Sequence, residues 1–273
     1  MNKFVPDLTG VSETMLLALH NRAGEAKRPD GVLTDPDSVR IYETIDYDFV
    51  HRFGSSEGSL AVRAAETDQV LRQWLAAHSD GFVVSLGEGL ETQVRRVDNG
   101  RMRWLSVDLP EAIRLRECFI PPTDRFRHLA TSALDRVWMD AVEPSSGVFI
   151  VAQGLFMYLE PEAVRRLFVD IVERFPGAEM VFDVIPRWFS GLTLWGLRRT
   201  PNYRLPPMPW GINCDEIEPT LRHWCPLLAT VELLRYRMPR GIWHDLDPLF
   251  RLNPLFRNAI PNLVHVTTAE GVE

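Results

Sequence analysis

The chain has 273 residues, of which 45% are hydrophobic and 25% charged, with a formal net charge of −7. This length fits one large domain, or one domain with an extra subdomain, and can bury a substantial core. The negative charge disfavours nucleic acid or an anionic membrane as a partner.

The cysteines and the apolar runs indicate in which cellular compartment the protein functions. Cys118, Cys214 and Cys225 lack metal-ligand spacing, so we expect reduced thiols in a cytoplasm and no metal site. No apolar amino-terminal run follows a basic start, and no apolar run is long enough to span a bilayer. We therefore expect neither a signal peptide nor a membrane partner.

The first part of the chain predicts helices. Residues 12–25 fit an amphipathic helix, and a second helix can start within residues 37–42. Such helices can cap a ligand site or serve only for packing, and the residues leave both alternatives open. Residues 60–78 give a stronger helical pattern, with an apolar face. Arg63 near its start is either a solvated charge or a guanidinium that pairs with a ligand carboxylate.

The first strand and the turn after it organise the rest of the chain. Residues 82–86 read as a buried parallel strand, Gly87-Glu88-Gly89 breaks it, and residues 90–97 read as a short helix. Strand, glycine turn and helix start form the usual ligand edge of an α/β sheet. Glycine lets the backbone approach a ligand, and the helix start presents free N–H groups. A tight turn with only a structural role would look similar.

A second strand, residues 103–107, ends at Asp108. This carboxylate follows the glycine turn by about 20 residues, the spacing at which an acidic residue meets a ribose diol. Asp108 can also cap the helix that begins at Pro110. The two roles are compatible.

Strands and helices then alternate, which predicts a parallel, doubly wound sheet. The elements in order are a helix at residues 110–119, strands at 126–131 and 147–152, a helix at 161–175 and a strand at 179–185. Ser132, Ala133 and Leu134 follow one strand, where small residues allow a planar ring to approach. Gln153 and Gly154 end the next strand.

After Pro186 the composition changes, because prolines become frequent and tryptophans cluster. The tryptophans are Trp188, Trp195, Trp210, Trp224 and Trp243. Residues 228–234 and 263–268 can supply two further strands. The region either walls an apolar pocket or forms a loop-rich subdomain with a small core of its own.

Four stretches resemble the leucine carboxyl methyltransferase family of class I methyltransferases, in its bacterial branch named after tetracenomycin polyketide O-methyltransferases. The glycine stretch, LGEGLETQVRRV, is similar to the family's LGAGLDTRxYRL. Residues 106–112 read SVDLPEA beside the family's EVDLPEV, and residues 152–159 read AQGLFMYL beside AEGLLMYL. The fourth stretch, Asp35-Pro36, matches a DP near the family's cap helices. The resemblance covers residues 33–185.

The resemblance implies a Rossmann-like, mostly parallel sheet of seven strands and S-adenosylmethionine as cofactor. It implies one methyltransferase domain over residues 1–273, with cap helices at 1–56, a cofactor-binding core at 57–186 and a substrate-pocket insert with the last strands at 187–273. The cofactor residues that it implies are Arg63, Gly87, Glu88, Gly89, Asp108, Leu109, Ser132, Ala133, Leu134, Gln153 and Gly154. Arg63 would hold the cofactor carboxylate, Asp108 the ribose, and residues 132–134 the adenine.

The chain departs from the family pattern at several of these positions. Glu88, Glu91 and Gln93 replace the common Ala, Asp and Arg, and Gln153 replaces a usual glutamate. Ser132 stands where the family usually has an aspartate. Loss of the arginine at Gln93 makes transfer of the family's substrate preference unsafe.

The predicted function is O-methylation of a small, mostly apolar acceptor, a carboxylate or a polyketide-like phenol. A carboxylate needs no base, whereas a phenol with a pKa of about 10 gains from one. Tyr158 matches the family's active-site tyrosine, and His223 and His244 are the candidate bases, although a lone histidine is more often structural. Trp188 and Trp210 are the candidate substrate contacts. The alternatives are a catalytically altered cofactor-binding protein of the same fold and an NAD(P)-dependent oxidoreductase.

Overall fold

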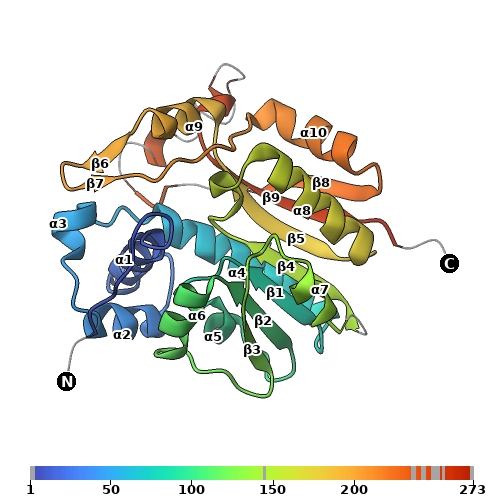
Figure 1. Ribbon diagram of the computed structural model, residues 1–273, viewed down its shortest axis with the longest axis horizontal. Helices are drawn as coiled ribbons and strands as arrows, with labels where there is room; N and C mark the ends of the chain where they lie inside the picture. Colours follow the sequence, from blue (N-terminus) through green and yellow to red (C-terminus); the bar gives the residue numbers. More distant parts are fainter. Residues whose placement is uncertain are drawn as a thin grey trace.

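The computed structural model describes residues 4–143, 146–234, 238–240, 244–246, 253 and 256–270. At its centre lies a seven-stranded sheet in the order β3-β2-β1-β4-β5-β9-β8 (Figure 1). The strands are β1 (Phe82–Leu86), β2 (Arg103–Asp108), β3 (Phe126–Ala130), β4 (Val148–Ala152), β5 (Glu179–Val184), β8 (Leu228–Leu234) and β9 (Asn262–Thr268). Strands β1 to β5 are parallel, and β9 runs antiparallel to both β5 and β8. The predicted mostly parallel, doubly wound sheet is confirmed.

The register of the central strands brings their carboxyl ends to one edge. Leu86 of β1 pairs with Val107 of β2, and Ser85 pairs with Val151 of β4. In this register the carboxyl ends of the three strands are level to within one or two residues. The residues that follow β1, β2 and β4 are therefore neighbours in space, although they are far apart in sequence.

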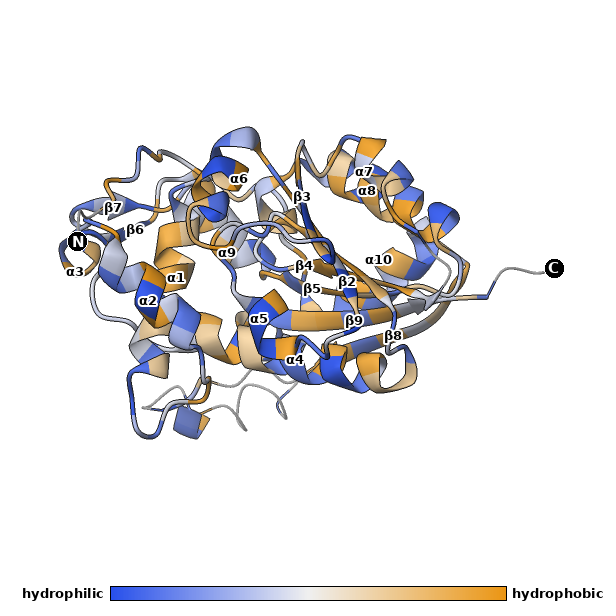
Figure 2. Ribbon diagram, turned by 90° about the horizontal axis from the view of Figure 1, so that it is seen from below, coloured by the Kyte–Doolittle hydropathy of each residue, from blue (hydrophilic) through white to orange (hydrophobic). Residues whose placement is uncertain are grey.

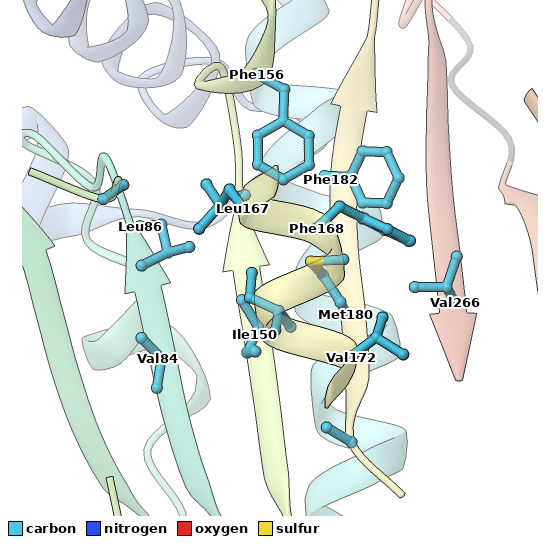
Figure 3. Packing of buried hydrophobic residues seen from close by; sticks show 14 of the residues in the cluster. Val84, Leu86, Ile150, Phe156, Leu167, Phe168, Val172, Met180, Phe182 and Val266 are labelled. Atoms are coloured by element: carbon cyan, nitrogen blue, oxygen red, sulfur yellow. The ribbon is translucent and has the colours of Figure 1, made fainter. Parts of the chain in front are cut away.

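The two faces of the sheet bury different side chains, because successive residues of a strand point to opposite sides. Val84 of β1 belongs to the hydrophobic cluster under α7 (Val137–Asp140), α8 (Pro161–Arg174) and α10 (Ile217–Trp224), whereas Val83 belongs to the cluster under the amino-terminal helices. Figure 3 shows Leu167 and Phe168 of α8 packed over the strands. Full burial of each such side chain stabilises the fold by about 1.5–3 kcal/mol.

Helix α8 follows the pattern that the sequence predicts for it. Pro161 occupies its first turn, where the missing N–H costs nothing, and its buried residues recur at helical spacing. Figure 2 shows the sheet strands mostly in hydrophobic colours and α8 with both polar and apolar residues. The helix therefore covers the sheet with one face and meets water with the other.

The amino-terminal helices are α1 (Thr14–Ala26), α2 (Pro36–Thr44), α3 (Phe49–Phe53) and α4 (Ser59–Ala77). Asp35 caps α2, because its carboxylate accepts the N–H of Ser38 at 3.0 Å. The short helix α5 (Gln93–Val97) begins three residues later than predicted. The turn continues to Glu91, whose N–H donates to the Glu88 carbonyl at 3.0 Å. Helix α6 (Pro110–Glu117) follows β2 as expected.

The segment after β5 is more regular than the sequence suggests. It contains α9 (Arg187–Leu194), α10 and a hairpin of β6 (Arg198–Thr200) and β7 (Tyr203–Arg204), and the hairpin lies beside α3 (Figure 1). Helix α9 spans only two turns and includes Gly191, which weakens its sequence signal. Among the described residues, no helix combines the length and apolar character needed to cross a bilayer.

Candidate active site

A cavity of about 790 Å³ lies at the carboxyl edge of the parallel strands. Its lining comes from α1 and α4, from the turns after β1, β2, β3 and β4, and from the segment after β5. Small-molecule sites usually occupy about 300–1,000 Å³, so the cavity has the size of a ligand site. Its position agrees with the rule that open α/β sheets bind ligands at this edge.

The glycine turn after β1 presents bare backbone to the cavity. Gly87 and Gly89 have φ angles of 64° and 52°, in the left-handed region. A Cβ on Gly89 would lie 2.8 Å from the Cβ of Met15, and one on Gly87 would lie 3.0 Å from Cδ1 of Leu155. The backbone conformation therefore favours glycine at both positions, and at Gly89 the space requires it as well.

Asp108 lies directly beside this turn. Its Oδ2 accepts the N–H of Gly89 at 2.7 Å, and its Oδ1 accepts the N–H of Leu109 at 2.7 Å. Burial raises the pKa of Asp108, and the two N–H groups oppose that rise. Each carboxylate oxygen has a second lone pair, so the group can also accept hydrogen bonds from ligand hydroxyls.

Arg63 reaches the same edge from the second turn of α4. Its Nη1 donates to Oδ2 of Asp183 at 2.8 Å, and the N–H of Gly154 donates to Oδ1 of Asp183 at 2.5 Å. Asp183 therefore fixes both the arginine and the turn after β4. The sequence prediction missed Asp183, although a carboxylate between Phe182 and Val184 in a mostly apolar strand is an available signal.

Gln153, at the end of β4, tests whether the cavity fits the cofactor that the resemblance implies. Neither Oε1 nor Nε2 of its amide has a hydrogen-bond partner in the described part of the chain, and both atoms are buried. Buried polar atoms are normally paired, so this amide fits a polar ligand that completes its hydrogen bonds. The bare glycine turn and the Asp108 carboxylate fit the methionine and ribose parts in the same way.

Glu88 lines the cavity, but its carboxylate is engaged elsewhere. Oε1 pairs with Nη2 of Arg116 at 2.8 Å, and Oε2 accepts the indole N–H of Trp104 at 3.1 Å. Burial raises its pKa, and the Arg116 charge opposes the rise. The backbone of Glu88 therefore remains the part that can border a ligand.

Tyr158 lines the cavity from a 3-10 turn that covers residues Phe156–Tyr158. Burial raises the pKa of its hydroxyl to about 12, while Thr14 and Arg63 act in the opposite direction. The phenol is therefore neutral at physiological pH. It can donate a hydrogen bond to a ligand, but it is not a base.

The expected adenine segment is only partly at the cavity. Ser132 and Ala133 line it, as does Leu109 on the neighbouring turn. Leu134 does not line the cavity and is 45% exposed. The prediction for Leu134 is therefore corrected, because the chain turns outward after Ala133.

Three further residues that the sequence predicts for the site do not line the cavity. His223 is exposed on α10, on the side opposite to the core residues Ile217 and Leu221, and His244 is not among the lining residues. Trp210 is 5% exposed, because its indole fills core space between Phe156 and Trp224.

Of the other tryptophans, Trp188 lines the cavity and is 52% exposed, at its outer rim. Trp243 lies outside the described residues. The structure thus places one of the two proposed tryptophan contacts at the cavity, and the first choice, Trp210, is wrong.

Large apolar side chains form the remaining wall. Met15 and Leu17 come from α1, Phe189 from α9, and Leu205 and Met208 from the irregular chain after β7. The sequence prediction named the two regions but none of these side chains. Methionine and leucine at helical spacing look like ordinary core until the facing elements are known.

Comparison with known proteins leads to the same family as the sequence motifs. The model of the leucine carboxyl methyltransferase family matches residues 18–172. The tetracenomycin polyketide synthesis O-methyltransferase TcmP of Streptomyces glaucescens is 31% identical over 184 residues, which are 66% of this chain and 68% of that protein. An S-adenosyl-L-methionine-dependent methyltransferase of Gibberella zeae, dpfgK, is 27% identical over 187 residues, 62% of each chain.

Solved structures agree at the level of the fold. The N-methyltransferase NodS of Bradyrhizobium japonicum WM9, in complex with S-adenosyl-L-homocysteine, has a TM-score of 0.50 and 14% identity, covering 96% of this chain and 100% of that one. The nicotinamide-dependent alternative finds no support among these relatives. The chain belongs to the leucine carboxyl methyltransferase family and is a methyltransferase with S-adenosylmethionine as its cofactor.

Proposed function

We propose that the protein methylates a carboxylate oxygen of a small, mostly apolar acid. When bound, S-adenosylmethionine supplies a methyl group on a positively charged sulfur. The observation that carries the proposal is the cavity lining, which combines an apolar wall with hydrogen-bond donors. None of its described lining residues is a histidine, a lysine or a cysteine.

The cofactor half of the proposal uses the turns at the strand ends. Arg63, oriented by Asp183, would pair with the cofactor carboxylate, and Gly87 and Gly89 would border its methionine part. Asp108 would accept the ribose hydroxyls, and the Gln153 amide would take a further polar contact. Ser132 and Ala133, with the backbone of Glu88, Leu109 and Gly154, would complete the contact surface.

The acceptor half depends on the absence of a histidine, a lysine or a cysteine among the described lining residues. A carboxylic acid with a pKa of about 4 is already ionised at neutral pH. A phenol with a pKa of about 10 is protonated, so its methylation is faster when a base accepts the proton. Tyr158 is protonated and can donate a hydrogen bond to a carboxylate. Orientation of the reacting groups in the cavity can lower the activation free energy by about 7–11 kcal/mol.

The test compares naphthoic acids with naphthols of the same ring position as methyl acceptors, using cofactor labelled in the methyl group. Methyl esters release methanol in mild alkali, whereas aryl methyl ethers are stable. We expect alkali-labile label from the acids. Label that appears only with naphthols and survives alkali contradicts carboxylate methylation. Tight cofactor binding without transfer to either series favours the catalytically altered protein.

A further inference from the structure

One cation of the cavity wall belongs to no family motif. Arg199, on β6, lines the cavity, and its side chain is 22% exposed. Its Nε donates to the carbonyl of Phe53 at 2.9 Å, and its Nη1 donates to Oε1 of Glu57 at 3.0 Å. No partner of Nη2 is found in the described part of the chain.

Contacts between the hairpin and α3 hold this arginine in place. The Thr200 hydroxyl donates to the Arg52 carbonyl at 2.7 Å, and the Asn202 amide donates to the His51 carbonyl at 3.2 Å. The Arg52 guanidinium also lies over the Tyr203 ring at 5.2 Å. A guanidinium fixed in this way loses little freedom when it binds a planar anion.

The other two cavity arginines each pair with a buried carboxylate. Arg22 pairs with Glu91 at 2.9 Å, and both side chains are less than 10% exposed. Arg63 pairs with Asp183, which is equally buried. The partner of Arg199 is different, because the Glu57 side chain is 44% exposed and lies on the loop before α4. An exposed ion pair is weak and is easily exchanged.

The Glu57 carboxylate marks the position of an anion at the cavity wall. It is held by Arg199 and by the Ser59 hydroxyl, which donates to Oε1 at 3.3 Å. Both donors line the cavity. The position also lies at the amino end of the 19-residue helix α4, whose dipole favours negative charge.

We infer that Arg199 determines acceptor specificity by binding the acceptor carboxylate at this position, in exchange for Glu57. The inference rests on the proposed methylation of carboxylic acids. Two parallel N–H bonds from a guanidinium fit a carboxylate better than a neutral amide or a phenol. Ser59, which helps to hold this position, lies one helical turn before Arg63, about 6 Å along α4, and both residues line the same cavity.

The experiment measures binding by calorimetry in the presence of S-adenosylhomocysteine. The probes are 2-naphthoate, anthracene-2-carboxylate and decanoate, each against its carboxamide. We expect the wild-type protein to prefer the carboxylates. Arg199→Gln should raise the Kd of the best carboxylate about ten-fold or more, and leave the carboxamide and S-adenosylhomocysteine unchanged. The Kd of Arg199→Lys for the carboxylate should lie between those of the wild type and Arg199→Gln, because lysine keeps the charge but cannot form two parallel hydrogen bonds.

Glu57→Gln is the matched control, because it breaks the same ion pair from the other side. If Arg199 binds the acceptor, this variant binds the carboxylate as tightly as the wild type or more tightly. If the pair is only structural, both variants weaken all ligands in parallel, which overturns the inference. Equal binding of every carboxylate and its carboxamide by the wild-type protein also overturns it. Should Arg199→Gln fail to fold, the opposite effects of Arg199→Lys and Glu57→Gln decide the question.

The two proposals fail in different ways. Carboxylate binding that depends on Arg199, with methyl label that resists alkali, supports the inference and refutes carboxylate methylation. Alkali-labile label from naphthoates, with affinity independent of Arg199, refutes the inference alone.

Discussion

At the scale of single residues, Asp108 has two tasks. It holds the glycine turn through the N–H of Gly89, and it presents its carboxylate to the cavity. We expect Asp108→Ala to weaken binding of S-adenosylhomocysteine by about 1.5–3 kcal/mol, the scale of a hydrogen bond to a charged group. Calorimetric titration measures the loss. Asp108→Asn is the control for shape, and equal affinity of wild type and Asp108→Ala would remove Asp108 from the site.

Tyr158 is expected to act as a donor at every accessible pH. Its pKa is raised to about 12 by burial, so the phenol stays protonated between pH 6 and pH 10. Tyr158→Phe should lower kcat/KM about 2–10-fold, the scale of one neutral hydrogen bond. The ratio of wild-type to variant rates should be flat over this range. A ratio that grows steadily as the pH rises would instead identify Tyr158 as a base.

Two tryptophans that look alike in the sequence should behave differently. Trp210→Ala removes a buried indole and should lower the free energy of unfolding by about 3–5 kcal/mol, without changing the affinity for S-adenosylhomocysteine. Trp188→Ala removes a half-exposed rim residue and should cost little stability but weaken binding of apolar acids. Urea unfolding and calorimetry separate the two. Loss of acid binding in Trp210→Ala without loss of stability would contradict the assignment.

At the scale of elements, a buried network of charges joins the glycine turn to the amino-terminal helices. Arg22 of α1 donates to the Leu90 carbonyl at 2.7 Å and pairs with Glu91 at 2.9 Å. Arg96 of α5 pairs with Glu91 at 2.7 Å and with Asp35, the cap of α2, at 2.9 Å. The glycine turn is thus fixed by α1, which lines the cavity, and by Arg96 of α5 together with Asp35 at the start of α2.

The same network accounts for two departures from the family pattern. Glu91 reaches both Arg22 and Arg96, and the Gln93 amide donates to Asp68 at 2.9 Å. Asp68 in turn binds Arg96 at 2.7 Å. Both residues therefore help to fix the turn, and of the two only Glu91 also lines the cavity.

Glu91→Gln should destabilise the protein most at neutral pH. Burial alone raises the pKa of Glu91, but Arg22 and Arg96 outweigh it and hold the pKa at about 2. A carboxyl group whose pKa is lowered by folding stabilises the folded state at pH values above its pKa in the unfolded chain, which is about 4.3. This stabilisation is lost as the pH falls toward 2. We expect a loss of about 3 kcal/mol at pH 7.

Urea unfolding of wild type and Glu91→Gln at pH 7 and pH 3 tests this prediction. The difference between the two proteins should shrink at pH 3. A difference of the same size at both pH values would show that the charge of Glu91 contributes nothing.

At the scale of the whole molecule, the cavity lies between three stretches of the chain: α1 and α4, the strand ends, and the segment after β5. A ligand that contacts all three binds only the folded state. S-adenosylhomocysteine at 100 times its Kd should therefore stabilise the protein by about 2.7 kcal/mol. A thermal shift assay with NADH at the same concentration is the control. A shift with NADH and none with S-adenosylhomocysteine would contradict the cofactor assignment.

Much of the sheet and of the cofactor edge could be predicted from the sequence. The apolar runs at residues 82–86 and 179–185 coincide with β1 and β5 to within one residue. Gly87, Gly89 and Asp108 could be placed together because parallel strands of successive βαβ units end at the same edge. These features depend on local composition and on one topological rule, both of which are present in the sequence.

The walls of the cavity depend on contacts between distant segments. Asp183 meets Arg63 across 120 residues, and Arg199 meets Glu57 across 142. Trp188 reaches the cavity and Trp210 the core, although both lie in one aromatic segment. The sequence by itself determined the parallel strands β1 to β5, the main helices between them, and the positions of the glycine turn and Asp108 at the strand ends. Only the tertiary structure decided which side chains face the acceptor, because that depends on how the cap and the insert pack over the sheet.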